Sequence, residues 1–152
     1  MPLSQSKKNA WVAFLVSNLV LQRKIDDALR RAGVAPLEMY DLLLSLEEAP
    51  DHRLRMRELG ETVLLTPSGI TRLVDRAEKL GYVKREGCPN DRRSLFTVLQ
   101  PEGIKARKEA WKVYEQLIDE HFASKLSDDE AEKISSSLSR LADDKALIGF
   151  QA

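Results

Sequence analysis

The sequence has little cysteine, few aromatic residues and no long apolar run. One cysteine among 152 residues excludes an internal disulfide framework and a zinc site built from several thiolates. The longest uninterrupted apolar stretch, residues 10–16, falls far short of the ~20 residues that cross a bilayer. Aromatic residues make up only 6%, and 7 Gly and 6 Pro interrupt the chain, which argues against a β-sandwich or barrel. No basic segment followed by an apolar core opens the chain, so we expect a cytoplasmic protein with no membrane partner.

Net charge is absent as well, because 24 Lys and Arg residues offset 24 Asp and Glu residues. At 43% hydrophobic and 32% charged, the composition is that of a folded domain. The charges are unevenly distributed: residues 51–100 hold ten basic and seven acidic side chains, whereas residues 101–152 hold eight and eleven. The middle third is therefore the basic part of the chain. This bias points to nucleic acid only if its arginines share one face.

Helical periodicity occupies both ends of the chain. Apolar residues recur at helical spacing over residues 9–31, 36–49, 101–122 and 127–141, and the last segment opens with the capping-box sequence Ser127-Asp128-Asp129-Glu130. The apolar stripe of the first helix is broad, so this helix is expected to pack on two sides. We expect residues 1–50 and 101–152 to form one helical region, with residues 51–100 as an insert.

The periodicity changes within this insert. Residues 56–81 predict two short helices with a tight connection, the second capped by Thr66 and ended by Gly81. Residues 82–86 and 95–99 predict two strands around a polar turn, and residues 51–54 are a candidate further strand. The predicted fold is mostly α (α+β), with six helices and a two- to three-stranded β-wing. The helix-turn-helix covers about 55–80 and the wing about 82–99, and together they form a winged helix-turn-helix.

The polar face of the second short helix is the first candidate DNA-binding surface. With its apolar residues turned inward, this helix exposes Ser68, Thr71, Arg72, Arg76 and Lys79. The first turns of a helix in a major groove meet base edges and phosphates. Arg72 can bind either a guanine edge or a phosphate, and the sequence does not choose between them. The alternative for this helix alone is a solvated amphipathic face.

The predicted hairpin tip is the second candidate surface. Arg92 and Arg93 lie there, and an arginine at such a tip can enter a minor groove and follow its negative potential. Asp91 would repel phosphate, so we expect it to brace the wing through a protein partner, an arginine that it orients. A solvated turn is the alternative for the hairpin alone. Helix and wing together favour binding to double-stranded DNA.

These residues resemble a known family. The run Asp91-Arg92-Arg93-Ser94-Leu95-Phe96-Thr97-Val98-Leu99 is similar to the wing signature of the MarR regulators, and TPSGITRLVDRAEKLGYVKR (residues 66–85) resembles their recognition helix and first wing strand. The resemblance implies an intertwined homodimer joined through the terminal helices. It also implies Arg93 in the minor groove and Asp91 bracing the wing. We expect a repressor, and two symmetric reading helices one helical turn apart predict a palindromic operator. Two positions depart from the pattern, because Gln100 and Arg55 stand where helix-capping Thr or Ser is usual.

The resemblance also implies a pocket between the interface helices and the DNA-binding lobe. The sequence leaves open whether its effector is a small aromatic or phenolic molecule, another compound, or none. Candidate residues for the wall of the pocket are Trp11, Leu15, Tyr40, Trp111 and Tyr114. Aromatic residues at helical spacing are more often plain core than pocket lining.

Other functions find less support in the sequence. The alternative to a regulator is a winged-helix protein-interaction module without specific DNA binding. No Ser/His/Asp group, phosphate loop or metal-ligand spacing indicates an enzyme, so we expect no catalysis, no cofactor and no metal. Cys88 has no resolving cysteine and is expected to be inert, and His52 and His121 are too few to suggest a metal site.

Overall fold

The computed structural model describes residues 1–62 and 67–142, apart from the side chains of Pro67, Ser68 and Arg92. These residues form six α-helices and one three-stranded sheet. The helices are α1 (Gln5–Arg31), α2 (Leu37–Glu48), α3 (Met56–Thr62), α4 (Pro67–Lys79), α5 (Pro101–His121) and α6 (Asp128–Ser139). The strands are β1 (Arg53–Arg55), β2 (Val83–Cys88) and β3 (Asp91–Leu99), and the short 3-10 turns are η1 (Pro50–His52) and η2 (Ala123–Lys125). The predicted fold class is confirmed.

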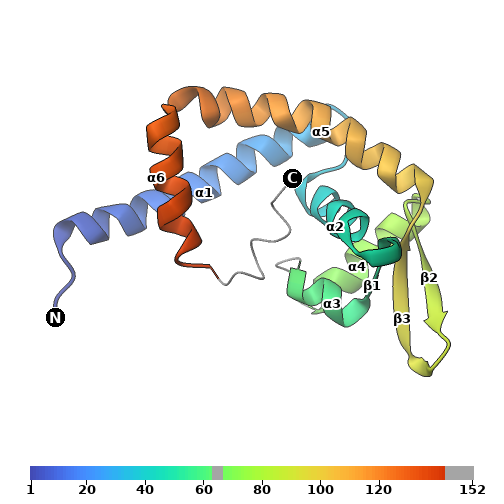
Figure 1. Cartoon of the computed structure of the whole chain (residues 1–152). Coiled ribbons are helices and arrows are strands. Elements are labelled where there is room, and N and C mark those ends of the chain that lie inside the picture. Colours follow the sequence, from blue (N-terminus) through green and yellow to red (C-terminus); the bar gives the residue numbers. More distant parts are fainter. Residues whose placement is uncertain (63–66, 143–152) are drawn as a thin grey trace.

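The elements divide into a long arm and a lobe (Figure 1). Helices α1 and α5 pack against each other along the arm, and α6 lies across α1 toward the N-terminus. Helices α2, α3 and α4 and the sheet form the lobe at the other end, where α3 and the β2–β3 hairpin lie on the side away from α5 (Figure 1). Among the helices described, none has the length and apolar content needed to cross a membrane.

The core of the lobe is built mainly by α2. Its residues Leu42, Leu43 and Leu46 are fully buried, together with Leu59 of α3 and Leu73 of α4. Helix α5 closes the same core with small residues of its first turns. Helix α2, which the sequence groups with the terminal helices, therefore contributes directly to the lobe.

Several helix ends follow from local chemistry. Helix α1 begins at Gln5, four residues before the predicted start, because the Ser4 hydroxyl accepts a hydrogen bond from the Lys7 N–H. Gly33 and Gly81 have φ angles of 73° and 76°, the left-handed conformation that ends a helix. The predicted capping box at Ser127 and Glu130 is confirmed.

The two positions without a usual capping residue, Gln100 and Arg55, differ in how the start of the following helix is satisfied. Gln100 makes no side-chain cap at the start of α5. Ahead of α3, the Glu58 carboxylate accepts the Arg55 N–H at 2.7 Å, so one backbone donor is satisfied without Ser or Thr. The expected cap at Thr66 lies outside the described residues.

The sheet has the order β1-β3-β2 and is antiparallel throughout. Strand β1 covers Arg53–Arg55 rather than residues 51–54, because η1 occupies residues 50–52. The hairpin is longer than predicted. Pairing continues through an irregularity between Gly87 and Cys88 as far as the pair Cys88 and Asp91. Arg92 and Arg93 therefore belong to β3, next to a narrow tip, rather than to a wide polar turn.

Candidate nucleic-acid interface

Helix α4 has one buried and one exposed face, as the periodicity predicts. Ile70, Leu73, Val74 and Ala77 are buried, whereas the exposed side chains are Thr71, Arg72, Asp75, Arg76, Glu78 and Lys79. Within the described residues, no ion pair engages Arg72. The side chain of Ser68 lies outside the described part. The outer face thus presents the guanidinium group of Arg72, which forms no ion pair with a described residue, in the first half of the helix.

Arg76 lies on the same helix but is paired. Its Nη2 donates to Glu38 Oε1 at 2.6 Å, and Arg30 Nη2 lies 4.0 Å from the same oxygen. Glu38 belongs to the first turn of α2 and Arg30 to the last turn of α1. Arg76 is therefore drawn toward α2, which distinguishes it from Arg72.

The wing is joined to the outer face of α4 by Arg85. This side chain of β2 is 20% exposed, and its Nη2 lies 2.6 Å from Asp75 Oδ1 while its Nη1 lies 3.0 Å from Glu78 Oε1. The Arg85 N–H also donates to Glu78 Oε2 at 3.2 Å. Sequence reasoning missed this clamp, although two acidic residues three apart on α4 and a basic residue in the next strand carried the signal. These charge-assisted hydrogen bonds link β2 to α4. Because Asp75 and Glu78 are 52% and 43% exposed, each link adds about 1 kcal/mol or less to this arrangement.

Asp91 organises the start of β3. Its Oδ1 accepts the Arg93 N–H and its Oδ2 accepts the Ser94 hydroxyl, both at 2.9 Å. The Arg93 hydrogen bond is the main cause that lowers the pKa of Asp91, with Ser94 and the charge of Arg55 adding to it. The partner is the main chain of an arginine rather than its guanidinium group. Arg93 thus has a fixed backbone and an exposed side chain. The side chain of Arg92 lies outside the described part.

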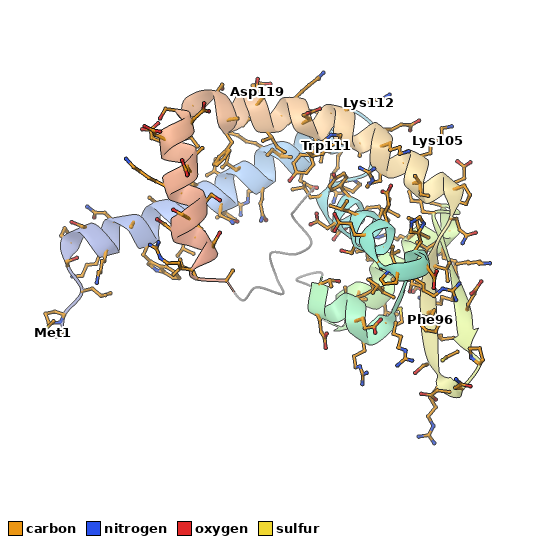
Figure 2. The ribbon with its side chains drawn as sticks, viewed as in Figure 1. Met1, Phe96, Lys105, Trp111, Lys112 and Asp119 are labelled. Carbon is orange, nitrogen blue, oxygen red and sulfur yellow. The ribbon has the colours of Figure 1, made fainter. Side chains whose placement is uncertain are left out.

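The five candidate residues for an effector pocket lie in two places. Tyr40, Trp111 and Tyr114 form one aromatic cluster, with ring centroids 6.1 Å apart for Tyr40 and Trp111 and 5.2 Å apart for Tyr40 and Tyr114. Figure 2 shows Trp111 on the side of α5 that faces α2. Trp11 instead lines an apolar hollow between α1 and α6 with residues such as Phe14 and Leu138. Leu15 remains 46% exposed on α1. The aromatic cluster and the α1 residues do not share one site in a single chain.

Asp41 lies next to the aromatic cluster. Burial raises the pKa of its carboxyl group to about 6, and no ion pair with another described residue offsets that burial. Burial also raises the pKa of Tyr114, and the charge of Asp41 adds to that shift. A half-buried carboxylate without a cation is unfavourable to the fold at neutral pH.

The part of the chain that the structure describes contains no candidate metal site. No three His, Cys, Asp or Glu side chains come together there in a way that could hold an ion. Cys88 is half-buried in β2.

A helix-turn-helix, a three-stranded wing clamped to it, and exposed arginines on both define a winged helix-turn-helix protein. The model of the MarR family matches residues 33–94. The regulator PrsX of Escherichia coli, described as HTH-type, is 34% identical over 88 residues, which are 58% of this chain and 52% of PrsX. The match thus spans about half the length of this curated relative.

Solved structures match over nearly the whole chain. AbsC, a MarR family transcriptional regulator from Streptomyces coelicolor, has a TM-score of 0.81 and 25% identity, covering 93% of this chain and 95% of AbsC. Sco3205 from the same organism, solved in complex with DNA, has a TM-score of 0.83 and 27% identity, covering 93% of this chain and 88% of Sco3205. The chain belongs to the MarR family. Its members are transcriptional regulators, which confirms the resemblance seen in residues 66–99 and the expectation that the chain is not an enzyme.

Proposed function

We propose that the chain is a sequence-specific regulator that binds double-stranded DNA and acts as a repressor. The observation that carries the proposal is the pair of exposed arginines Arg72 and Arg93, on two elements that the ion pairs of Arg85 link. A guanidinium group on a reading helix can contact base edges, and one on a wing can follow the potential of a minor groove. The related Sco3205 was solved in complex with DNA, which supports the same role here.

In this proposal α4 enters the major groove and the wing lies over the adjoining minor groove. Ser68, Thr71 and Arg72 lie toward the start of α4, where side chains of a docked helix reach bases and phosphates. Arg93, and Arg92 next to it, contact the minor groove. Arg76 has a supporting role, because Glu38 holds its guanidinium group toward α2.

We further propose that the regulator is a homodimer. The arm exposes large apolar side chains on α1, including Trp11 at 61%, Val16 at 53% and Leu19 at 51%, and Leu141 beyond α6 is 77% exposed. Contiguous apolar surface of this kind is typical of a protein–protein interface. A twofold dimer would bring two copies of α4 to successive major grooves, ~34–36 Å apart, and so would read a palindrome.

The effector site is proposed at the aromatic cluster alone. The rings of Tyr40, Trp111 and Tyr114 pack on one another between α2 and α5, and Tyr40 is buried. A small aromatic or phenolic molecule would therefore stack on the half-buried rings of Trp111 and Tyr114. Trp11 and Leu15 join this site only if the second copy brings them. In a Trp11→Phe variant, 4-hydroxybenzoate is expected to quench the fluorescence of Trp111 saturably. Linear, unsaturable quenching would remove the site from the proposal.

Selection of bound sequences from random duplex DNA tests the function directly. We expect an enriched palindrome with half-sites one helical turn apart, and an affinity that falls steeply with salt as phosphate counterions are released. Light scattering is expected to give twice the chain mass of 17.2 kDa for the free protein. A failure to enrich any sequence, with no dependence of binding on salt, would favour the protein-interaction module instead.

A further inference from the structure

An open hollow lies between the start of α3 and the base of the wing. The residues that line it come from β1, α3 and β3, and they are Arg55, Met56, Arg57, Asp91, Arg93, Ser94 and Leu95. Three arginines from three different elements thus line one open hollow, together with the single acidic residue Asp91. Phe96, labelled in Figure 2, follows Leu95 in β3, and its ring contacts the guanidinium group of Arg55.

Positive charge exceeds negative charge in this hollow, because three arginines line it beside the single carboxylate of Asp91, whose charge interacts with that of Arg55. Arg57 and Arg93 are exposed and make no ion pair with any described residue. Arg55 lies over the Phe96 ring, 5.5 Å from its centroid, so its charge also faces an aromatic ring. The two oxygens of Asp91 already accept hydrogen bonds from Arg93 and Ser94. The hollow therefore has donors and charge to offer an anion.

We propose that this hollow binds one phosphate of the DNA backbone, held by Arg55 and Arg57 at the base of the wing, while the side chain of Arg93 extends to the minor groove. The inference rests on the proposed binding to DNA and adds a contact that the sequence pattern did not indicate. Guanidinium groups bind phosphate oxygens through paired, charge-assisted hydrogen bonds. A hollow open to solvent between two elements suits a backbone group that approaches from outside.

The position of the hollow gives this phosphate a positioning role. Contacts to phosphate fix the register of a protein on the duplex but do not read sequence. A phosphate held between α3 and β3 would set the distance of the wing from the helix-turn-helix as the wing meets the minor groove. Loss of the contact should therefore weaken binding to every sequence by the same factor.

Single charge-removing variants test the contact. In fluorescence-anisotropy titrations on the selected duplex, Arg57→Gln and Arg55→Gln are each expected to lower affinity about tenfold and to reduce the salt slope by about one. The matched control is Lys112→Gln on α5, an exposed residue on the side of the molecule away from the wing (Figure 2). Its affinity is expected to stay within about twofold of the wild-type value. Arg57→Gln and Lys112→Gln should keep the wild-type melting curve, whereas Arg55→Gln should melt slightly lower because it loses its contact with the Phe96 ring.

A second arm identifies the source of the phosphate. In a series of duplexes, one phosphate per half-site is replaced by an uncharged methylphosphonate, at a different position in each duplex. At the position of the bound phosphate, wild type and Arg57→Gln should bind with equal affinity. Inorganic phosphate alone is expected to give no saturable binding to the free protein. Saturable binding of inorganic phosphate that Arg57→Gln removes, with operator affinity unchanged, would assign the hollow to a free anion and overturn the inference.

The same titrations distinguish an absent phosphate contact from an absence of DNA binding. If wild type binds the selected duplex and both arginine variants bind as Lys112→Gln does, the phosphate contact is wrong while the regulator stands. If wild type enriches no duplex at all, the regulator itself is wrong.

Discussion

Arg76 of α4 donates a 2.6 Å hydrogen bond to the carboxylate of Glu38 in α2, and Arg30 of α1 lies 4.0 Å from the same oxygen. One acidic side chain therefore lies where three helices approach each other. Helix α1 belongs to the proposed dimer arm, and α4 is the proposed reading helix. The carboxylate of Glu38 connects the two.

Arg76→Gln and Glu38→Gln should each change the free energy of unfolding by less than about 1 kcal/mol, because the pair is solvent-exposed. If Arg76 positions α4, both variants lower operator affinity, and the double variant is no weaker than either single one. A double-mutant cycle on operator affinity measures this. Weakened binding in Arg76→Gln alone would mean that Arg76 contacts DNA directly and that Glu38 has no positioning role.

Arg93→Ala is expected to weaken operator binding by about 10- to 100-fold, since one charge-assisted contact is worth about 1–3 kcal/mol. The Asp91 hydrogen bond to the Arg93 N–H does not involve the deleted side chain, so the wing should keep its fold. Anisotropy at fixed salt measures affinity, and light scattering with a thermal melt checks mass and stability. Lys112→Ala serves as the control, and equal affinity of the two variants would contradict the minor-groove role.

The variants Arg72→Ala and Lys79→Ala distinguish sequence-specific contacts to bases from electrostatic attraction to the phosphate backbone. Arg72 follows the first turn of α4, and its loss should relax the preference for one base pair in each half-site. Lys79 ends the helix, so its loss should weaken all duplexes alike. Repeating the duplex selection with each variant compares the two enriched patterns. An Arg72→Ala pattern identical to the wild-type pattern would limit Arg72 to phosphate contacts.

Asp41→Asn should stabilise the protein above pH 6. Burial raises the pKa of Asp41 from 3.8 to about 6, so the fold prefers the protonated acid, and this contribution is lost as pH rises through 6. We expect a gain of about 1–2 kcal/mol at pH 8, reduced from the full shift because the group is partly exposed. The gain should vanish below pH 4. Urea melts across this range measure it, and a difference independent of pH would contradict the assignment.

Gly103→Ala should destabilise the lobe. A Cβ on Gly103 would overlap the carbonyl oxygen of Tyr82 and lie 2.7 Å from Leu99 Cδ1, so α5 would have to move away from the sheet. Such overpacking costs about 1–3 kcal/mol. The matched control is Gly60→Ala in α3, where a Cβ meets nothing within 4 Å and a helical alanine should be neutral or stabilising. Equal melting temperatures of the two variants would contradict this packing.

Sequence patterns predicted most of the fold because the elements carry strong local signals. The buried residues of α4 recur at helical spacing, and Gly33 and Gly81 adopt the positive φ angles expected where a helix ends. The wing was predicted too short because Gly87-Cys88-Pro89-Asn90 reads as turn residues. Pairing across the strands extends through Gly87 and Cys88, and no local pattern contains that information.

For a similar reason, the exposed residues of the candidate site were predicted, but most contacts between its elements were not. Exposure of Arg72 and Arg93 follows from their positions on one helix and one hairpin. The Glu38–Arg76 pair and the hollow at Arg55 and Arg57 join residues far apart in sequence, so only the folded chain brings them together. The Arg85 clamp joins residues 7 and 10 positions apart, but across a helix and a strand whose relative placement no local pattern gives. The aromatic candidates were split for the same reason, because Trp11 shares helical periodicity with α1 but not a surface with Tyr40.

The bonds from Arg85 to Asp75 and Glu78 join α4, the proposed major-groove helix, to the hairpin proposed for the minor groove. In the proposed complex, a rotation of α4 out of its groove would favour departure of the hairpin as well. Because exposed ion pairs of this kind are worth about 1 kcal/mol or less, the coupling would make states in which the hairpin stays on the DNA after the helix has left less populated without abolishing them.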